Sequence, residues 1–165
     1  MSAVIEGHHD DHHHGPAKGI TRWLYTTNHK DIGSLYLWFS FIMLFIGGAM
    51  AMVIRAELFE PGSQIVSPEF YNQMVTNHGL IMVFGVIMPA FVGLANWLIP
   101  MQIGAPDMAL PRLNNLSFWI LPAAFGVLLA TFFMEGGAPN FGWTFYAPLS
   151  TEYAPPTVTY FIFAV

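Results

Sequence analysis

The chain has 165 residues, of which 55% are hydrophobic and only 9% are charged. Soluble domains carry roughly 25% charged residues, so a water-soluble fold of this composition would expose too much apolar surface, and a disordered chain would be poorer in apolar residues. The net charge of −5 argues against a nucleic-acid partner, and the lack of cysteine excludes disulfides, thiolate metal sites and cysteine nucleophiles. These figures predict an integral membrane protein.

The N-terminal stretch HHDDHHHGPAKG is polar and of low complexity, so it cannot bury a core. We expect residues 1–19 to form a flexible His/Asp-rich arm and residues 20–165 to form the membrane domain. The arm contains donors for a divalent metal, although an ordinary solvated tail has the same composition. No apolar core of the signal-peptide type lies in the first 31 residues, so we expect no cleavage there.

Long uncharged gaps predict where the chain crosses the bilayer, because a crossing helix needs about 20 apolar residues. We predict spans at about 33–54, 71–100 and 114–134, the second of which is long enough to tilt or to project beyond the hydrocarbon. A fourth apolar run begins at Thr157 and covers nine residues, about 14 Å of helix. We interpret it as the start of a further span in a truncated chain; a short surface segment is the alternative.

Basic residues predict the orientation of these spans, since lysine and arginine gather on the cytoplasmic side. Lys18, Arg22 and Lys30 precede the first span, and Arg112 lies between the second and the third. Only Arg55 would then lie on the outer side. We therefore predict an all-α, multi-pass protein with its N-terminus in the cytoplasm.

Four residues of a candidate ligand site belong to the outer half. His78 lies inside the second predicted span, where an ionisable side chain is costly, and a neutral imidazole is a good ligand for iron or copper. The small Gly79 beside it would leave room for a planar ligand. A hydrogen bond to a neighbouring helix explains His78 equally well. Arg55, Tyr71 and Trp143 could bind the anionic edge of a cofactor or form an ordinary interfacial belt.

A second polar group belongs to the inner half and contains Asn96, Asp107, Asn114 and Asn115. Asp107 follows His78 by 29 residues, about 43 Å of helix, so the two belong to opposite surfaces. An acid flanked by asparagines at a cytoplasmic mouth could collect protons and pass them to a file of water. The alternative is structural: an asparagine caps the third span, and the aspartate shapes a turn.

Four stretches of the chain match one family closely: TTNHKDIGSLYLWFSF, VIRAELFEPG, NHGLIMVFGVIMPAFVGLANWLIPMQIGAPDMALPRLNNLSFWILP and FGWTFYAPLS. From Trp23 to Val165 the chain resembles subunit I of the haem–copper cytochrome c oxidases, of the bacterial aa3 kind. The run IGAPDMALPRLNNLSFW is the most specific part of the match. The resemblance implies a twelve-helix bundle, of which this chain would hold the N-terminal three spans and the start of a fourth.

The resemblance implies roles for the outer residues. His78 matches one of the two axial ligands of the low-spin haem, a haem a in this kind of oxidase. Arg55 matches the arginine that hydrogen-bonds the formyl group of that haem, and Tyr71 and Trp143 match residues near its propionates. Ligands of the second haem and of copper lie in later helices of the family.

Further roles implied by the resemblance concern protons and ions. Asp107 matches the acid at the entrance of the D proton pathway, and the asparagines just inside that entrance are matched by Asn96, Asn114 and Asn115. Glu57 and Gly62 match positions near an outer calcium or sodium site, for which Glu60 is a further candidate.

The resemblance implies a subunit of a terminal respiratory oxidase in the bacterial inner membrane, working with subunits II and III and pumping protons. Cytochrome c is the expected electron donor, because Ile46 and Met50 stand where quinol-using relatives carry an arginine and an aspartate. Three alternatives stay open: a quinol-oxidising relative, a transporter or channel fragment with His78 and Asp107 in its pathway, and a truncated fragment with no chemistry of its own.

Overall fold

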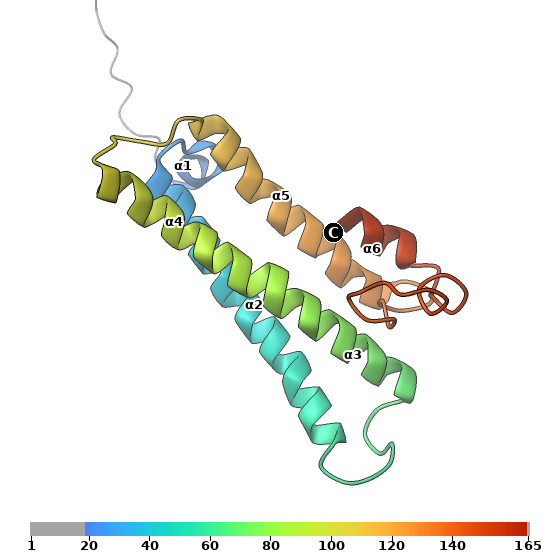
Figure 1. Cartoon of the computed structure of the whole chain (residues 1–165). Helices are drawn as coiled ribbons and strands as arrows, with labels where there is room; N and C mark the ends of the chain where they lie inside the picture. The colour runs from blue at the N-terminus through green and yellow to red at the C-terminus, as the bar shows by residue number, and fades with distance from the viewer. Residues whose placement is uncertain (1–18, 165) are drawn as a thin grey trace, which may run out of the picture.

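The structure is a computed structural model that describes residues 19–164, and this range is helical without any strand (Figure 1). Its elements are α1 (Ile20–Tyr25), α2 (His29–Glu57), α3 (Pro68–Leu80), the π-helix η1 (Ile81–Ile87), α4 (Met88–Ile103), α5 (Pro111–Ala130), the 3₁₀-helix η2 (Thr131–Phe133) and α6 (Val158–Ala164). The predicted all-α fold is confirmed. The predicted N-terminal arm lies outside the described residues, apart from Gly19.

Three helices are long and apolar enough to cross a membrane: His29–Glu57, Pro68–Ile103 and Pro111–Phe133. The second is one continuous helix of 36 residues made of α3, η1 and α4, about 54 Å long, which exceeds the roughly 30 Å of hydrocarbon. The three predicted spans therefore correspond to real helices. The fourth predicted run corresponds to the short α6, which lies beside α5 (Figure 1).

The first two of these helices start earlier than the predicted spans because polar residues cap them. The Asn28 side chain accepts from the Lys30 amide at 2.8 Å, so α2 begins at His29 and includes charged residues in its first turn. Ser67 caps α3 in the same way, ahead of a proline at the first helical position. Gaps between charges mark only the apolar part of a helix, and caps decide where it begins.

α2 packs closely against the long helix Pro68–Ile103 through glycine. A Cβ placed on Gly33 would lie 2.8 Å from the Gly93 carbonyl oxygen and 2.6 Å from Trp97 Cδ1. Farther along α2, a Cβ on Gly47 would lie 2.8 Å from Met82 Sδ. Small residues let membrane helices approach closely, so these glycines fix how the two helices cross.

Aromatic rings join α2 to α5. The Tyr36 ring meets Phe118 edge to face at 5.2 Å, and Phe39 meets Phe125 at 5.6 Å. All four side chains are buried and belong to the core of the described chain. Edge-to-face pairs of this kind add to the area that the rings bury. The third span is therefore held mainly by its aromatic face.

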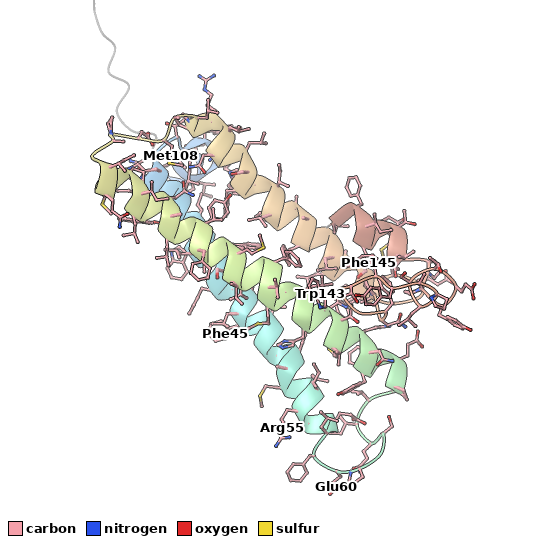
Figure 2. The ribbon with its side chains drawn as sticks, in the orientation of Figure 1. Phe45, Arg55, Glu60, Met108, Trp143 and Phe145 are labelled. Atoms are coloured by element: carbon pink, nitrogen blue, oxygen red, sulfur yellow. The ribbon has the colours of Figure 1, made fainter. Side chains whose placement is uncertain are left out.

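Residues 134–157, the α5–α6 loop, fold back over α3. The Asn77 amide donates to the Pro139 carbonyl at 3.1 Å, and the Thr157 hydroxyl bonds the Gly137 carbonyl at 2.5 Å. This loop and the start of α3 lie at the end of the bundle that carries Glu57. The opposite end carries the loop between α4 and α5, which contains Asp107 and the labelled Met108 (Figure 2).

Replacing Gly33 with alanine tests the glycine contact. Overpacking of a tight contact costs about 1–3 kcal/mol, so we expect Gly33→Ala to lower the Tm of the solubilised full-length subunit. Gly126→Ala is the matched control, because a Cβ there has no neighbour within 4 Å and alanine favours a helix interior. Equal Tm values for the two variants would contradict the proposed role of the contact.

Candidate functional site

His78 projects from α3 toward α2. Its Nδ1 lies 2.9 Å from the carbonyl oxygen of Gly47. Because a carbonyl only accepts, Nδ1 carries the proton and donates, which leaves the lone pair of Nε2 without a hydrogen-bond partner among residues 19–164. Metal-binding histidines are commonly oriented by such a bond from the second ring nitrogen. The half-buried imidazole is therefore held in the tautomer that can bind a metal through Nε2.

The backbone beside this imidazole is open. A Cβ on Gly48 or on Gly79 would have no heavy atom within 4 Å, whereas the neighbouring Gly47 packs against Met82. Two helices thus present side-chain-free backbone next to one free imidazole nitrogen. A flat, largely apolar group fits this surface, and the donor is one that haem iron accepts.

The other outer residues lie near His78 to different degrees. Tyr71 precedes His78 by seven residues, so it lies within about 20° of the same helix face. Trp143, 57% exposed, places its ring 6.5 Å from the Phe84 ring of the same long helix (Figure 2). Arg55 is exposed near the end of α2 and makes no hydrogen bond or ion pair within the described part of the chain.

At the opposite end, Asp107 lies at the start of α2. Its Oδ1 accepts from the His29 amide at 3.3 Å and from the Met108 amide at 2.8 Å. The positive end of a helix stabilises an anion, so this half-buried carboxylate has a defined position. The loop from α4 to α5 presents it beside the start of the first span.

Asn96 makes hydrogen bonds to two other polar residues at this end of the bundle. Its carbonyl oxygen lies 2.8 Å from Nδ1 of the buried His29 ring, and its side-chain oxygen accepts from Asn114 at 2.6 Å. The structure thus brings Asn96, Asn114 and Asp107 together around one histidine. It does not bring in Asn115, whose Nδ2 is buried without a partner in the described residues.

Sequence reasoning missed three members of this network. They are His29, Tyr36 and Ser117. The Ser117 hydroxyl bonds the Asn114 carbonyl at 2.7 Å and lies 2.9 Å from the Tyr36 hydroxyl. The spacing of three between 114 and 117 on one helix was an available signal. The others depend on contacts between distant segments.

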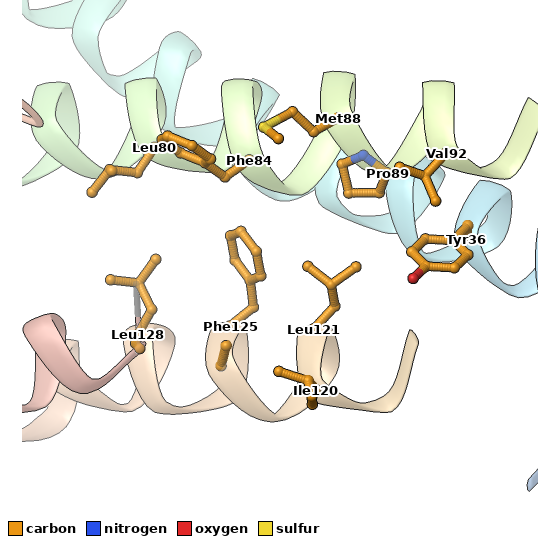
Figure 3. A pocket seen from close by; sticks show the side chains of 12 residues that line it. Tyr36, Leu80, Phe84, Met88, Pro89, Val92, Ile120, Leu121, Phe125 and Leu128 are labelled. Atoms are coloured by element: carbon orange, nitrogen blue, oxygen red, sulfur yellow. The ribbon is translucent and has the colours of Figure 1, made fainter. Parts of the chain in front are cut away.

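Tyr36 also lines a cavity of about 320 Å³ between the long helix and α5 (Figure 3). The remaining walls are apolar and include Phe84, Phe125 and Leu80. Leu80 comes two residues after His78 and therefore projects about 200° away from it on the helix. Among the described residues that line this cavity, Tyr36 is the one with a polar side chain.

Glu57 closes the turn after α2. Its carboxylate accepts from the backbone amides of Gln64, Ile65 and Val66 at 2.8, 2.9 and 3.0 Å, and the side chain is 5% exposed. Three amide donors occupy most of the roughly four lone-pair sites of a carboxylate. These three bonds therefore account for the geometry of the loop, and they leave few lone pairs of the carboxylate free to bind a cation.

Gly62 and Glu60 belong to the same turn. Gly62 has φ +103°, a conformation that favours glycine, and Glu60 is exposed at the tip (Figure 2). Within residues 19–164 no cluster of three or more His, Cys, Asp or Glu side chains could hold a metal ion. The outer ion site stays a prediction.

Comparison with known proteins decides the family. Residues 31–165 match the family model described as "Cytochrome C and Quinol oxidase polypeptide I". The chain belongs to this oxidase family. Its members are multi-span membrane subunits, and the family implies haem and copper as cofactors.

Individual relatives agree with this assignment. The oxidase chain is 47% identical over 146 residues to cytochrome c oxidase subunit 1 of Corynebacterium diphtheriae, and 48% identical over 145 residues to a probable cytochrome c oxidase subunit 1-alpha of Streptomyces avermitilis. Each alignment covers 87% of this chain. It is also 48% identical over 139 residues, 84% of the chain, to a haem–copper oxidase subunit I+III of Aeropyrum pernix.

The oxidase chain spans about a quarter of the length of its curated relatives, 26% and 25% for the first two and 17% for the subunit I+III. Its residues therefore provide only part of the relatives' sites.

Glu57→Gln tests the carboxylate cap of the turn in this oxidase subunit. The amide NH₂ would replace one acceptor and face a backbone N–H, and hydrogen bonds to charged groups contribute about 1.5–3 kcal/mol each. We expect the amides of Gln64, Ile65 and Val66 to exchange hydrogen faster by mass spectrometry. Glu60→Gln, at the exposed tip, is the control, and identical exchange in both variants would show that the cap does not hold the turn.

Proposed function

We propose that this chain is part of the catalytic subunit of a terminal respiratory oxidase, which passes electrons from cytochrome c to dioxygen and pumps protons. In this proposal the chain supplies one axial ligand of the low-spin haem and the entrance of the D proton pathway. The observation that carries it is the imidazole of His78, oriented through Nδ1 by Gly47 O at 2.9 Å, in a chain of the oxidase family.

His78 would hold the haem iron through Nε2, and open backbone at Gly48 and Gly79 supports a flat group beside it. Bound there, the haem supplies reversible one-electron transfer. The bond to Gly47 makes the imidazole a better donor and fixes its ring plane. A second ligand for the iron would have to come from another segment, because His78 is the one ligand that this chain is proposed to supply.

Arg55, Tyr71 and Trp143 would bind the polar edges of that haem. The exposed Arg55 has no partner within residues 19–164, so its guanidinium is free to bind a formyl oxygen. Tyr71 and Trp143 carry one O–H and one N–H donor suited to propionate oxygens. Hydrogen bonds of this kind adjust the redox potential of a haem. We propose haem a for the site, as in the oxidases that this chain resembles.

Asp107 would take up protons at the cytoplasmic surface. Neutral amides of Asn96 and Asn114, joined at 2.6 Å, can orient water without binding a proton themselves. We extend the proton-conducting group to Tyr36 and Ser117, because the Ser117 hydroxyl donates to the backbone carbonyl of Asn114 and lies 2.9 Å from the Tyr36 hydroxyl. Asn115 belongs to the proposed entrance by resemblance and not through a contact.

Cytochrome c, rather than a quinol, is the proposed donor. Ile46 packs against the core and Met50 is 9% exposed, so neither position offers a polar group to a quinone head. The family description covers both kinds of oxidase, and this local chemistry favours the first. We propose subunits II and III as partners in the bacterial inner membrane, with the N-terminus in the cytoplasm.

Glu57 and Gly62 remain the proposed contacts of an outer calcium or sodium ion. Calcium takes six to eight oxygen ligands, and the Glu57 carboxylate already accepts three amide bonds. Such an ion would therefore depend mainly on carbonyl oxygens of the turn and on water.

His78→Ala in the full-length subunit tests the ligand role. Alanine removes the only nitrogen proposed to bind the iron from this chain, so we expect the low-spin haem absorbance to be lost from the reduced-minus-oxidised spectrum. Gln102→Ala, an exposed polar position on the same helix, should leave the spectrum unchanged. An unaltered spectrum for His78→Ala would rule out the assignment.

Asp107→Asn tests the proton entrance. The amide oxygen can still accept from His29 and Met108, so the fold is kept while the charge is lost. We expect at least a tenfold slower turnover and reduced pumping at normal haem content, measured by oxygen uptake and by acidification outside vesicles. Glu135→Gln, a neutralised exposed carboxylate at the other end, is the control. Unchanged proton-coupled turnover in Asp107→Asn would refute the entrance.

A further inference from the structure

Two residues of α3 tie the α5–α6 loop to the helix just before the candidate haem ligand. Thr76 Oγ1 accepts a hydrogen bond from the Gly142 amide at 3.1 Å, and the Asn77 amide donates to the Pro139 carbonyl at 3.1 Å. Thr76 and Asn77 are 4% and 0% exposed. Buried hydrogen bonds between two segments fix their relative position, because breaking one leaves a polar group unpaired away from water. The loop is therefore attached rigidly to this turn of α3.

The bond to Thr76 lies one residue before Trp143. It holds the amide of Gly142, which has φ +78° and immediately precedes the residue that carries the indole. The indole ring itself lies 6.5 Å from the ring of Phe84, tilted by 58°. Thr76 and Phe84 both belong to the long helix. The backbone just before Trp143 and the Trp143 ring thus both contact the long helix that carries His78.

We propose that Thr76 is a positioning residue: its hydroxyl holds Trp143 in register with the long helix and thereby sets the redox potential of the haem. The inference rests on the proposed function, in which His78 binds the iron and Trp143 donates to a propionate. An N–H beside a carboxylate offsets part of its negative charge. Negative charge near iron favours the oxidised state, so a displaced Trp143 lowers the midpoint potential.

Single variants of the assembled oxidase test this role. Thr76→Val removes the acceptor at nearly constant volume, and Thr76→Ser keeps it. We expect the midpoint potential of the low-spin haem, from spectroelectrochemical titration, to fall in the valine variant and to stay at the wild-type value in the serine variant. Thr151→Val is the matched control, since the exposed Thr151 bonds only the nearby Pro148 carbonyl at 3.2 Å. Its potential should not change.

A double-mutant cycle shows whether Thr76 acts through Trp143. Trp143→Phe should lower the potential as well, and adding Thr76→Val to it should produce no further shift, because coupled residues give non-additive effects. Additive shifts, or an unshifted Thr76→Val, would overturn the proposal.

Haem content separates positioning from assembly. If Thr76→Val lacks the low-spin haem, the cycle is repeated with Thr76→Ala. Loss of haem in both variants would overturn the proposal, because the hydroxyl would then be needed for haem assembly and not for the position of Trp143. His78→Ala is measured in the same series. Retained low-spin haem in that variant defeats the proposed function, whereas its loss together with an unshifted Thr76→Val defeats only the inference.

Discussion

In a bilayer, two apolar helices gain little from leaving the lipid, so α2 and the long helix Pro68–Ile103 must be held by close contact and by hydrogen bonds. Glycine provides the contact, with Gly33 against the Gly93 carbonyl. The Ser40 hydroxyl provides a bond, since it donates to the Val86 carbonyl at 2.7 Å. Val86 lies in the π-helical segment η1, where the wider turn alters the usual pairing of carbonyl groups. Backbone groups in lipid need partners within the protein, and a side chain from the adjacent helix supplies one here.

Both polar sites depend on this helix pair. At one end the Gly47 carbonyl orients His78, and at the other the Asn96 carbonyl contacts the ring of His29. Each contact joins a backbone oxygen of one helix to an imidazole of the other. A shift of α2 along its partner would break both together, so the proposed ligand and the proposed proton entrance belong to one rigid unit. The π-helix lies between them, three residues after His78, and sets the rotation of one end relative to the other.

The bilayer makes composition informative, which is why gaps between charges predicted three spans that the structure contains. The ends of the helices were less predictable. The cap Asn28 lies ahead of charged residues, so α2 begins before the uncharged stretch from which its span was predicted. The site follows the same division. His78 and Asp107 could be selected in the sequence as rare ionisable groups, and their roles stay predictions. His29 could not be selected, since its contact with Asn96 joins residues 67 apart in the chain. Adjacent asparagines look equivalent in sequence, yet neighbouring residues project about 100° apart on a helix, so only Asn114 reaches Asn96.

The cavity beside Tyr36 limits what this chain can do alone. Water needs two or more polar partners to occupy a cavity in an ordered way, and the walls beyond the Tyr36 hydroxyl are apolar as far as Leu80 and Leu128. Within residues 19–164, the polar contacts that begin at the Asp107 end therefore stop at Tyr36. A proton that reaches this point needs polar groups from other segments to continue. The first two relatives are more than three times as long as this chain, and their remaining length can supply such groups. The proposed proton entrance therefore reaches no farther than Tyr36 within the described residues.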